Sequence, residues 1–168
     1  MREATLCFLV RDDPFPQVLL GWKKAGFGAD KYAGFGGKVE PGETVVQAAA
    51  RELEEETGIR VPERNLLPAG RLTFLFPAQP SWSQVVYLFL VRTWRGRAYE
   101  SREMRPRWFP VDGLPLDQMW QDSAHWLPVL LAGQGVRATF VFESDNKTIA
   151  TMSQESWPLD GRQTPDAR

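Results

Sequence analysis

Four glutamates crowd into residues 52–56 of this chain, directly after Arg51. On a helix, like charges three and four residues apart repel one another, so this crowding does not stabilise the fold. The same spacing turns Glu52, Glu55 and Glu56 toward one patch of space. Clustered carboxylate oxygens suit Mg²⁺ or Mn²⁺, and Mg²⁺ usually completes its shell with a substrate phosphate. The segment therefore predicts a metal-dependent reaction at a phosphate group.

The helix that would carry these glutamates is expected over residues 45–57. Its small apolar residues form a stripe opposite the acidic face, which is typical of a helix packed on a sheet. Glu43 or Thr44 could cap its first turn, and Gly58 can take the left-handed conformation that ends a helix. The acidic face is thus expected to point away from the sheet, and the glycine-rich segment 34–37 leads onto the helix.

The remaining apolar runs predict a mixed sheet with a helix on each side, an α/β/α sandwich. The expected strands are Thr5–Arg11, Val18–Trp22, Gly70–Phe76, Gln84–Arg92, Arg107–Val111, Arg137–Phe142 and Thr148–Met152. A second helix is expected over Leu116–Leu131. No repeat or linker divides the 168 residues, so we expect one domain over residues 1–153 and a flexible polar tail over 154–168.

Composition excludes several classes of partner. The net charge is −1, so there is no electrostatic footprint for duplex nucleic acid. The single cysteine, Cys7, lies in an apolar run and is expected to be a buried strand residue in a reducing compartment. No stretch approaches 18 apolar residues, which excludes a membrane span and favours a cytoplasmic protein. The seven Trp and ten Phe suit stacking against nucleobases as well as core packing.

The spacing of the acidic segment has a known counterpart. Gly37, five residues, Glu43, seven residues and the string from Arg51 to Ile59 match in full the signature that identifies the Nudix hydrolases. These enzymes cleave nucleoside diphosphates linked to another moiety. The resemblance implies the Nudix fold, an α/β/α sandwich, and a divalent cofactor, Mg²⁺ or Mn²⁺. It also implies a small-molecule nucleotide substrate, and we expect a monomer.

The residues suggest a division of roles at this site. Glu52, Glu55 and Glu56 are the expected metal ligands, and the resemblance adds the carbonyl of Gly36. Divalent ions held in this way neutralise charge on phosphate oxygens and activate water. Glu52 is the first candidate for the general base, and Glu103 is the second, either as base or as a further ligand. The sequence does not separate these two roles.

Two cations and a carboxylate near the glutamates have other expected roles. Arg51 is expected to brace Glu52 or the preceding loop through a bidentate contact, and so to support catalysis without touching substrate. Glu43 is expected to tie the loop to the helix. Lys38 follows the glycines, where its ammonium could meet a phosphate.

The resemblance extends over residues 3–152 to the MutT-homologue group of the family, which hydrolyses 8-oxo-dGTP. It rests on segments 19–24, 26–28, 34–39, 103–109 and 119–126. Carried over position by position, it implies a base pocket and places Lys23 near the sugar or phosphates. The implied pocket residues are Phe27, Ala33, Phe74, Met104, Trp120, Asp122 and Ser123.

Two pocket positions depart from the group's pattern. Ala33 stands where an asparagine is expected, and Ser123 replaces the second of two aspartates. Buried polar contacts discriminate strongly between bases. Their loss therefore predicts that selectivity for 8-oxo-dGTP is weaker than in the rest of the group, or depends on other residues. Ordinary dNTPs and 2-oxo-dATP-like purines become candidate substrates beside 8-oxo-dGTP.

The sequence therefore leaves three candidate functions. The first is hydrolysis of a purine nucleoside triphosphate to the monophosphate and pyrophosphate, a sanitation of the nucleotide pool. The second is hydrolysis of dinucleoside polyphosphates or of nucleoside diphosphates linked to another moiety, X. The acidic segment is expected to bind the diphosphate and not X, so it does not distinguish these substrates. The third is a non-catalytic nucleotide-sensing module, which the complete set of glutamates disfavours.

Overall fold

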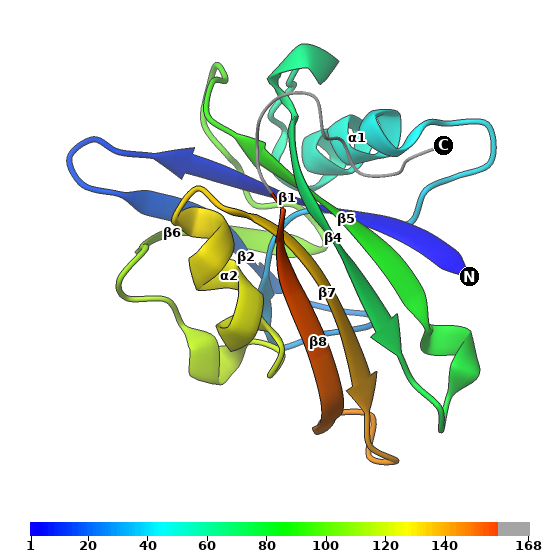
Figure 1. Ribbon diagram of the computed structural model, residues 1–168. Coiled ribbons are helices and arrows are strands. Elements are labelled where there is room, and N and C mark those ends of the chain that lie inside the picture. Colours follow the sequence, from blue (N-terminus) through cyan, green and yellow to red (C-terminus); the bar gives the residue numbers. More distant parts are fainter. Residues whose placement is uncertain (158–168) are drawn as a thin grey trace.

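The computed structural model describes residues 1–157 and shows one mixed β-sheet (Figure 1). The strands are β1 (Arg2–Arg11), β2 (Gln17–Lys23), β3 (Tyr32–Ala33), β4 (Leu67–Leu75), β5 (Gln84–Val91), β6 (Met104–Pro110), β7 (Gly135–Phe142) and β8 (Ile149–Trp157). Their order is β3-β2-β1-β5-β4-β7-β8, and β6 also pairs with β2. The pairs β1–β5 and β4–β7 are parallel and the others antiparallel.

Two helices cover the two faces of this sheet, so the expected α/β/α sandwich is confirmed (Figure 1). On one face, α1 (Val45–Thr57) packs through Leu53 and its other apolar residues into a core that includes Cys7. On the other face, α2 (Ser123–Leu131) packs through Trp126 and Leu127. Within residues 1–157, no helix is both long and apolar enough to cross a membrane.

Helix α1 begins and ends where the sequence predicts. Thr44 accepts a hydrogen bond from the backbone N–H of Gln47, whose side chain accepts one from the N–H of Thr44, which forms a capping box. At the other end Gly58 adopts φ 79°, and its N–H donates to Glu54. Because both ends are fixed, the position of the glutamates along the helix is fixed as well.

The expected second helix was wrong in its first half. Residues 116–118 form only a 3-10 turn, and Met119 adopts extended backbone before α2 begins at Ser123. Met119 is buried in the core, the next residue, Trp120, is half-buried, and both line a cavity. The extended backbone at Met119 interrupts what the sequence predicts as one helix.

Several strand ends also differ from expectation, most of all at the C-terminal strand. Strand β8 runs through Trp157, so residues 154–157 are paired with β7 instead of belonging to a tail. Residues 154–156 are polar, which concealed the strand, although Glu155 pairs with Arg137 of β7 at 3.6 Å and Trp157 is buried. The rest of the predicted tail, residues 158–168, lies outside the described residues. Strand β6 begins at Met104, three residues before the expected start.

The capping box yields a stability prediction. Thr44→Ala removes the side-chain acceptor for the Gln47 N–H, so we expect the free energy of unfolding to fall by about 1 kcal/mol. Urea denaturation followed by circular dichroism measures this change. Thr44→Ser keeps the hydroxyl and serves as the control. Equal midpoints for Thr44→Ala and the parent would contradict the role assigned to the cap.

Candidate active site

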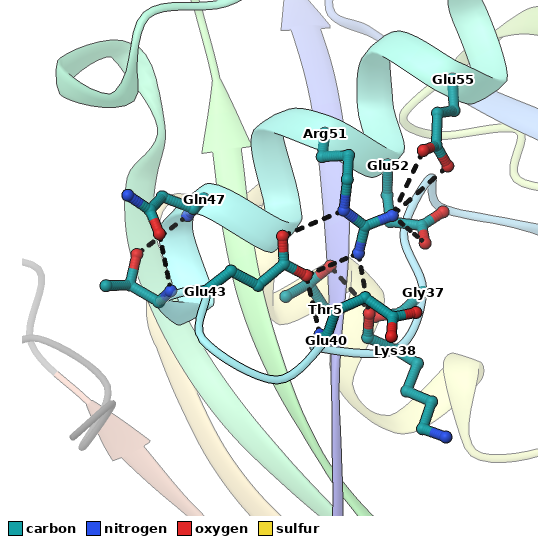
Figure 2. A network of polar contacts seen from close by, with 10 residues as sticks. Thr5, Gly37, Lys38, Glu40, Glu43, Gln47, Arg51, Glu52 and Glu55 are labelled. Atoms are coloured by element: carbon teal, nitrogen blue, oxygen red, sulfur yellow. Dashed lines mark hydrogen bonds and ion pairs between the residues drawn. The ribbon is translucent and has the colours of Figure 1, made fainter.

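Arg51 is the central residue of the polar network that joins α1 to the loop before it, residues 34–44, called the glycine-rich loop below (Figure 2). Its Nε and one terminal nitrogen donate to the two carboxylate oxygens of Glu43 at 3.0 and 2.6 Å, a bidentate pair. The same side chain donates to the backbone carbonyl of Lys38 at 3.0 Å, to Glu52 at 2.9 Å and to Glu55 at 3.4 Å. The arginine therefore binds the loop, as expected, and holds two of the acidic side chains.

The glycine-rich loop lies against both β1 and the acidic helix. Thr5 donates its backbone N–H to the carbonyl of Gly37 at 2.9 Å, which anchors the loop on the strand. A Cβ at Gly37 would stand 2.6 Å from the Glu52 carboxylate, so a larger residue there would displace that carboxylate from its present position. The N–H of Gly36 donates to Glu56 at 2.9 Å. The two glycines thereby set the positions of two glutamates.

The acidic side chains share one electrostatic environment. Burial, together with the charges of Glu52 and Glu103, raises the pKa of Glu56 to about 8 against the lowering effects of the Gly36 N–H and Lys23. Burial also raises the pKa of Glu52, as do Glu55 and Glu103, while Arg51 lowers it. Four carboxylates from α1 and the segment before β6 therefore act on one another.

The donor set fits a divalent cation. Its members are hard oxygen ligands, which suit Mg²⁺ or Mn²⁺, and a cation would relieve the mutual repulsion that raises the pKa values of Glu52 and Glu56. In the part of the chain that the structure describes, no three acidic, His or Cys side chains already converge on one point. Carboxylates that repel one another are expected to stand apart in this way until a cation draws them together.

A cavity starts at this acidic end and continues between the sheet and the segment before α2. Gly36, Gly37 and Glu56 line one end of it. All seven residues that the sequence assigned to a base pocket line the cavity, together with Lys23: Phe27, Ala33, Phe74, Met104, Trp120, Asp122 and Ser123. Residues from strands β1 to β7, both helices and the segments that connect them thus meet in a single space, and it holds both carboxylate and aromatic groups.

Aromatic rings form the wall of the cavity far from the glutamates. Phe27 stacks on Trp120 with ring centroids 5.3 Å apart and planes 19° from parallel. Trp82 meets the Phe27 ring edge-on at 5.0 Å. Phe74 stacks on Phe140 at 5.8 Å, which fixes its ring on the sheet. Flat, close-set rings of this kind suit a planar heterocycle.

Two polar residues lie at the start of α2, beside the aromatic wall. Asp122 is 4% exposed, and one of its carboxylate oxygens accepts a hydrogen bond from the indole N–H of Trp126 at 2.7 Å. Burial raises the pKa of Asp122 to about 6 despite that hydrogen bond. Ser123 is equally buried and lines the same cavity. A partly protonated carboxyl group and a hydroxyl are therefore available to a ligand in this space.

Not every residue named from the sequence reaches the cavity. Lys38 is exposed, and its carbonyl, not its ammonium, takes part in the network around Arg51. Glu103 is exposed on the segment before β6 and acts on the glutamates only through its charge. Sequence reasoning missed Tyr32 and Gln84, which also line the cavity. Strand pairing could have found Gln84, because it lies directly opposite Phe74.

The buried carboxyl of Asp122 predicts how stability depends on pH. Its folded pKa of about 6 lies above the ordinary value of 3.8, so its contribution is full below pH 4 and is lost as the pH rises through 6. At pH 7 the loss is on the order of 1–3 kcal/mol. Asp122→Asn stays neutral, so we expect its stability relative to the parent to increase from pH 4 to pH 7.

Urea denaturation at a series of pH values between 4 and 7 measures this difference. The exposed Asp117→Asn variant is the matched control and should follow the parent at every pH. Parallel stability curves for Asp122→Asn and the parent would contradict the account.

Comparison with known proteins agrees with this geometry. The chain is 44% identical over 127 residues to an oxidized purine nucleoside triphosphate hydrolase of Danio rerio, covering 76% of this chain and 80% of that protein. It is 42% identical over 137 residues to the protein of the same description from Mus musculus, covering 82% and 85%. A MutT protein of Bacillus halodurans shares the fold, with a TM-score of 0.74 over 92% of this chain and 98% of that one, at 24% identity.

The family model described as the NUDIX domain matches residues 1–130, which contain the glycine-rich loop, α1 and most of the cavity wall. Members of this family generally depend on divalent metal ions. With this match, and with relatives above 40% identity over most of their length, the chain belongs to the Nudix family of hydrolases.

Proposed function

We propose that this enzyme hydrolyses purine nucleoside triphosphates, including 8-oxo-dGTP, to the monophosphate and pyrophosphate, and so cleanses the nucleotide pool. The observation that carries the proposal is the single cavity that begins at Glu56 and Gly36 and ends at Trp120 and Phe27. A nucleotide laid along it has phosphates at the carboxylates and its base at the rings. The two relatives named as oxidized purine nucleoside triphosphate hydrolases support the same substrate class.

The chain's own residues divide the work of this reaction. Arg51 is a positioning residue, because it holds the loop and Glu52 but does not line the cavity. Glu52, Glu55 and Glu56 would hold Mg²⁺ with the Gly36 carbonyl, and that ion supplies charge neutralisation at the phosphates. Glu52 is the first candidate to accept a proton from the attacking water, and Glu103 is the second. Lys23, which lines the cavity, can pair with a phosphate oxygen.

The remaining assignments concern how the enzyme acts in the cell. The proposal includes action as a monomer on a free nucleotide, and the net charge of −1 provides no electrostatic footprint for duplex nucleic acid. Cys7 is a free, fully buried thiol, in keeping with a reducing compartment such as the cytoplasm. Mg²⁺ is the proposed ion, and Mn²⁺ is the alternative with the same preference for oxygen ligands.

Glu56→Gln tests the enzymatic part of the proposal. Removing one of the shared carboxylate charges should lower kcat for pyrophosphate release from 8-oxo-dGTP by about 100-fold or more. Glu54→Gln on the same helix is the matched control, because Glu54 is exposed and pairs only with Arg60. Chelation of divalent ions should stop the parent enzyme, and added Mg²⁺ should restore it.

Equal activity of the Glu56→Gln and Glu54→Gln variants would refute the assigned role of the acidic face. Binding of nucleotide without hydrolysis by the parent would instead favour a sensing module. Dinucleoside polyphosphates and nucleotide sugars belong in the same assay, because the acidic face alone does not distinguish them from triphosphates.

Selectivity is expected to rest on the two positions that depart from the group's pattern. The methyl group of Ala33 cannot hydrogen-bond a base, and Ser123 offers a hydroxyl in place of a carboxyl. We expect the parent to prefer 8-oxo-dGTP over dGTP by less than about 100-fold in kcat/KM. The double variant Ala33→Asn, Ser123→Asp should raise that preference. A preference of several hundred-fold in the parent, or none gained in the variant, would contradict this account.

A further inference from the structure

Gln84 is a polar side chain in the wall of the base pocket that the preceding account does not use. It is the first residue of β5, it is half-buried, and it lines the cavity. Among the described residues, no protein group forms a hydrogen bond with its side-chain amide. Two other polar groups in the wall have protein partners, since the Thr5 hydroxyl donates to Gly37 and Asp122 accepts from Trp126. Gln84 therefore keeps both an amide donor and an amide acceptor for a ligand.

Strand register explains why this amide faces the cavity. Gln84 lies directly opposite Phe74 in the antiparallel pair β4–β5, so the two side chains share one face of the sheet. Val86, two residues further along β5, lies on that face too, and both Phe74 and Val86 line the cavity. Gln84 is thus the polar end of a row of side chains that forms the floor of the pocket.

Gln84 and Asp122 approach the cavity from different elements. Asp122 comes from the start of α2, and Gln84 comes from the sheet. A carboxylate suits the Watson–Crick edge of a guanine ring, where two adjacent N–H groups donate. An amide on another wall would then meet a different edge of the same ring.

The imidazole edge differs between guanine and 8-oxoguanine. Guanine presents two acceptors there, N7 and O6. In 8-oxoguanine N7 carries a hydrogen, so a donor stands between two carbonyl acceptors. A glutamine amide can accept from that N–H and donate to a neighbouring carbonyl at once, whereas with guanine its carbonyl oxygen faces the N7 lone pair.

We propose that Gln84 is a specificity-determining residue that reads the imidazole edge of the base and favours 8-oxoguanine over guanine. This inference rests on the proposed function, since it assumes a purine in the pocket. It assigns to β5 a hydrogen-bonding role that Ala33 cannot fill. The residue that discriminates between the bases thus lies on the sheet side of the pocket. A bidentate amide contact of this kind changes the ratio of the two affinities by about 5- to 100-fold.

Equilibrium binding of 8-oxo-dGMP and dGMP to the full chain, measured by calorimetry, tests the proposal. Gln84→Met keeps the length of the side chain and removes both hydrogen-bonding groups. We expect the parent to bind 8-oxo-dGMP more tightly than dGMP. In the variant, the ratio of the two affinities should fall by at least about 5-fold. Gln134→Met, at an exposed position, is the matched control and should keep the parent ratio.

An equal loss of affinity for both ligands in the Gln84→Met variant would assign Gln84 a merely structural role and overturn the proposal. An unchanged ratio, or equal binding of the two ligands by the parent, would overturn it as well. Because these monophosphates are bound and not cleaved, the result does not depend on whether the triphosphates are hydrolysed. A failure of the proposed function would appear instead as absent pyrophosphate release by the parent.

Discussion

The ion-pair network around Arg51 is the interaction on which the rest of the site depends. One guanidinium binds Glu43 with two hydrogen bonds, reaches the backbone of Lys38, and contacts Glu52 and Glu55 (Figure 2). A planar group with five donors can do this at once, whereas a lysine ammonium cannot. The network offsets part of the repulsion among the glutamates and fixes the glycine-rich loop beside α1. Without it, the Glu52 carboxylate would have no fixed place against Gly37.

The sheet adds a second constraint, because it joins the acidic end of the cavity to the aromatic end. Strand β1 holds the glycine-rich loop through Thr5, and its parallel neighbour β5 carries Gln84 and Val86 along the cavity. The break before α2 turns Trp120 into the same space. The reaction is therefore determined mainly by α1 and its loop, while the choice of base is left to side chains from other elements.

The sequence predicted the elements whose signals are local. Helix α1 was placed correctly because an apolar stripe, a capping threonine and Gly58 all act within a few residues. The second helix was overextended because apolar residues continue through Met119 and Trp120, although the backbone is extended at Met119. Strand β8 was cut short because residues 154–156 are polar, and their pairing with β7 is a non-local property that composition does not reveal.

The candidate site shows the same difference between what local patterns predict and what depends on non-local packing. The seven pocket residues were named from a family pattern, and all seven line one cavity. Gln84 was missed because its place depends on register with β4, a non-local property that composition does not reveal. The electrostatic state of Glu56 and Asp122 was also beyond the sequence, since burial sets the pKa of each.

The central claim is that the acidic face and the aromatic wall act on one purine nucleoside triphosphate. Product analysis tests it most directly: the protein is incubated with 8-oxo-dGTP, with and without Mg²⁺, and the products are separated by anion-exchange chromatography. The account predicts equal amounts of 8-oxo-dGMP and pyrophosphate, formed only with the metal. Release of inorganic phosphate with the diphosphate, or no turnover in the presence of Mg²⁺, would contradict it.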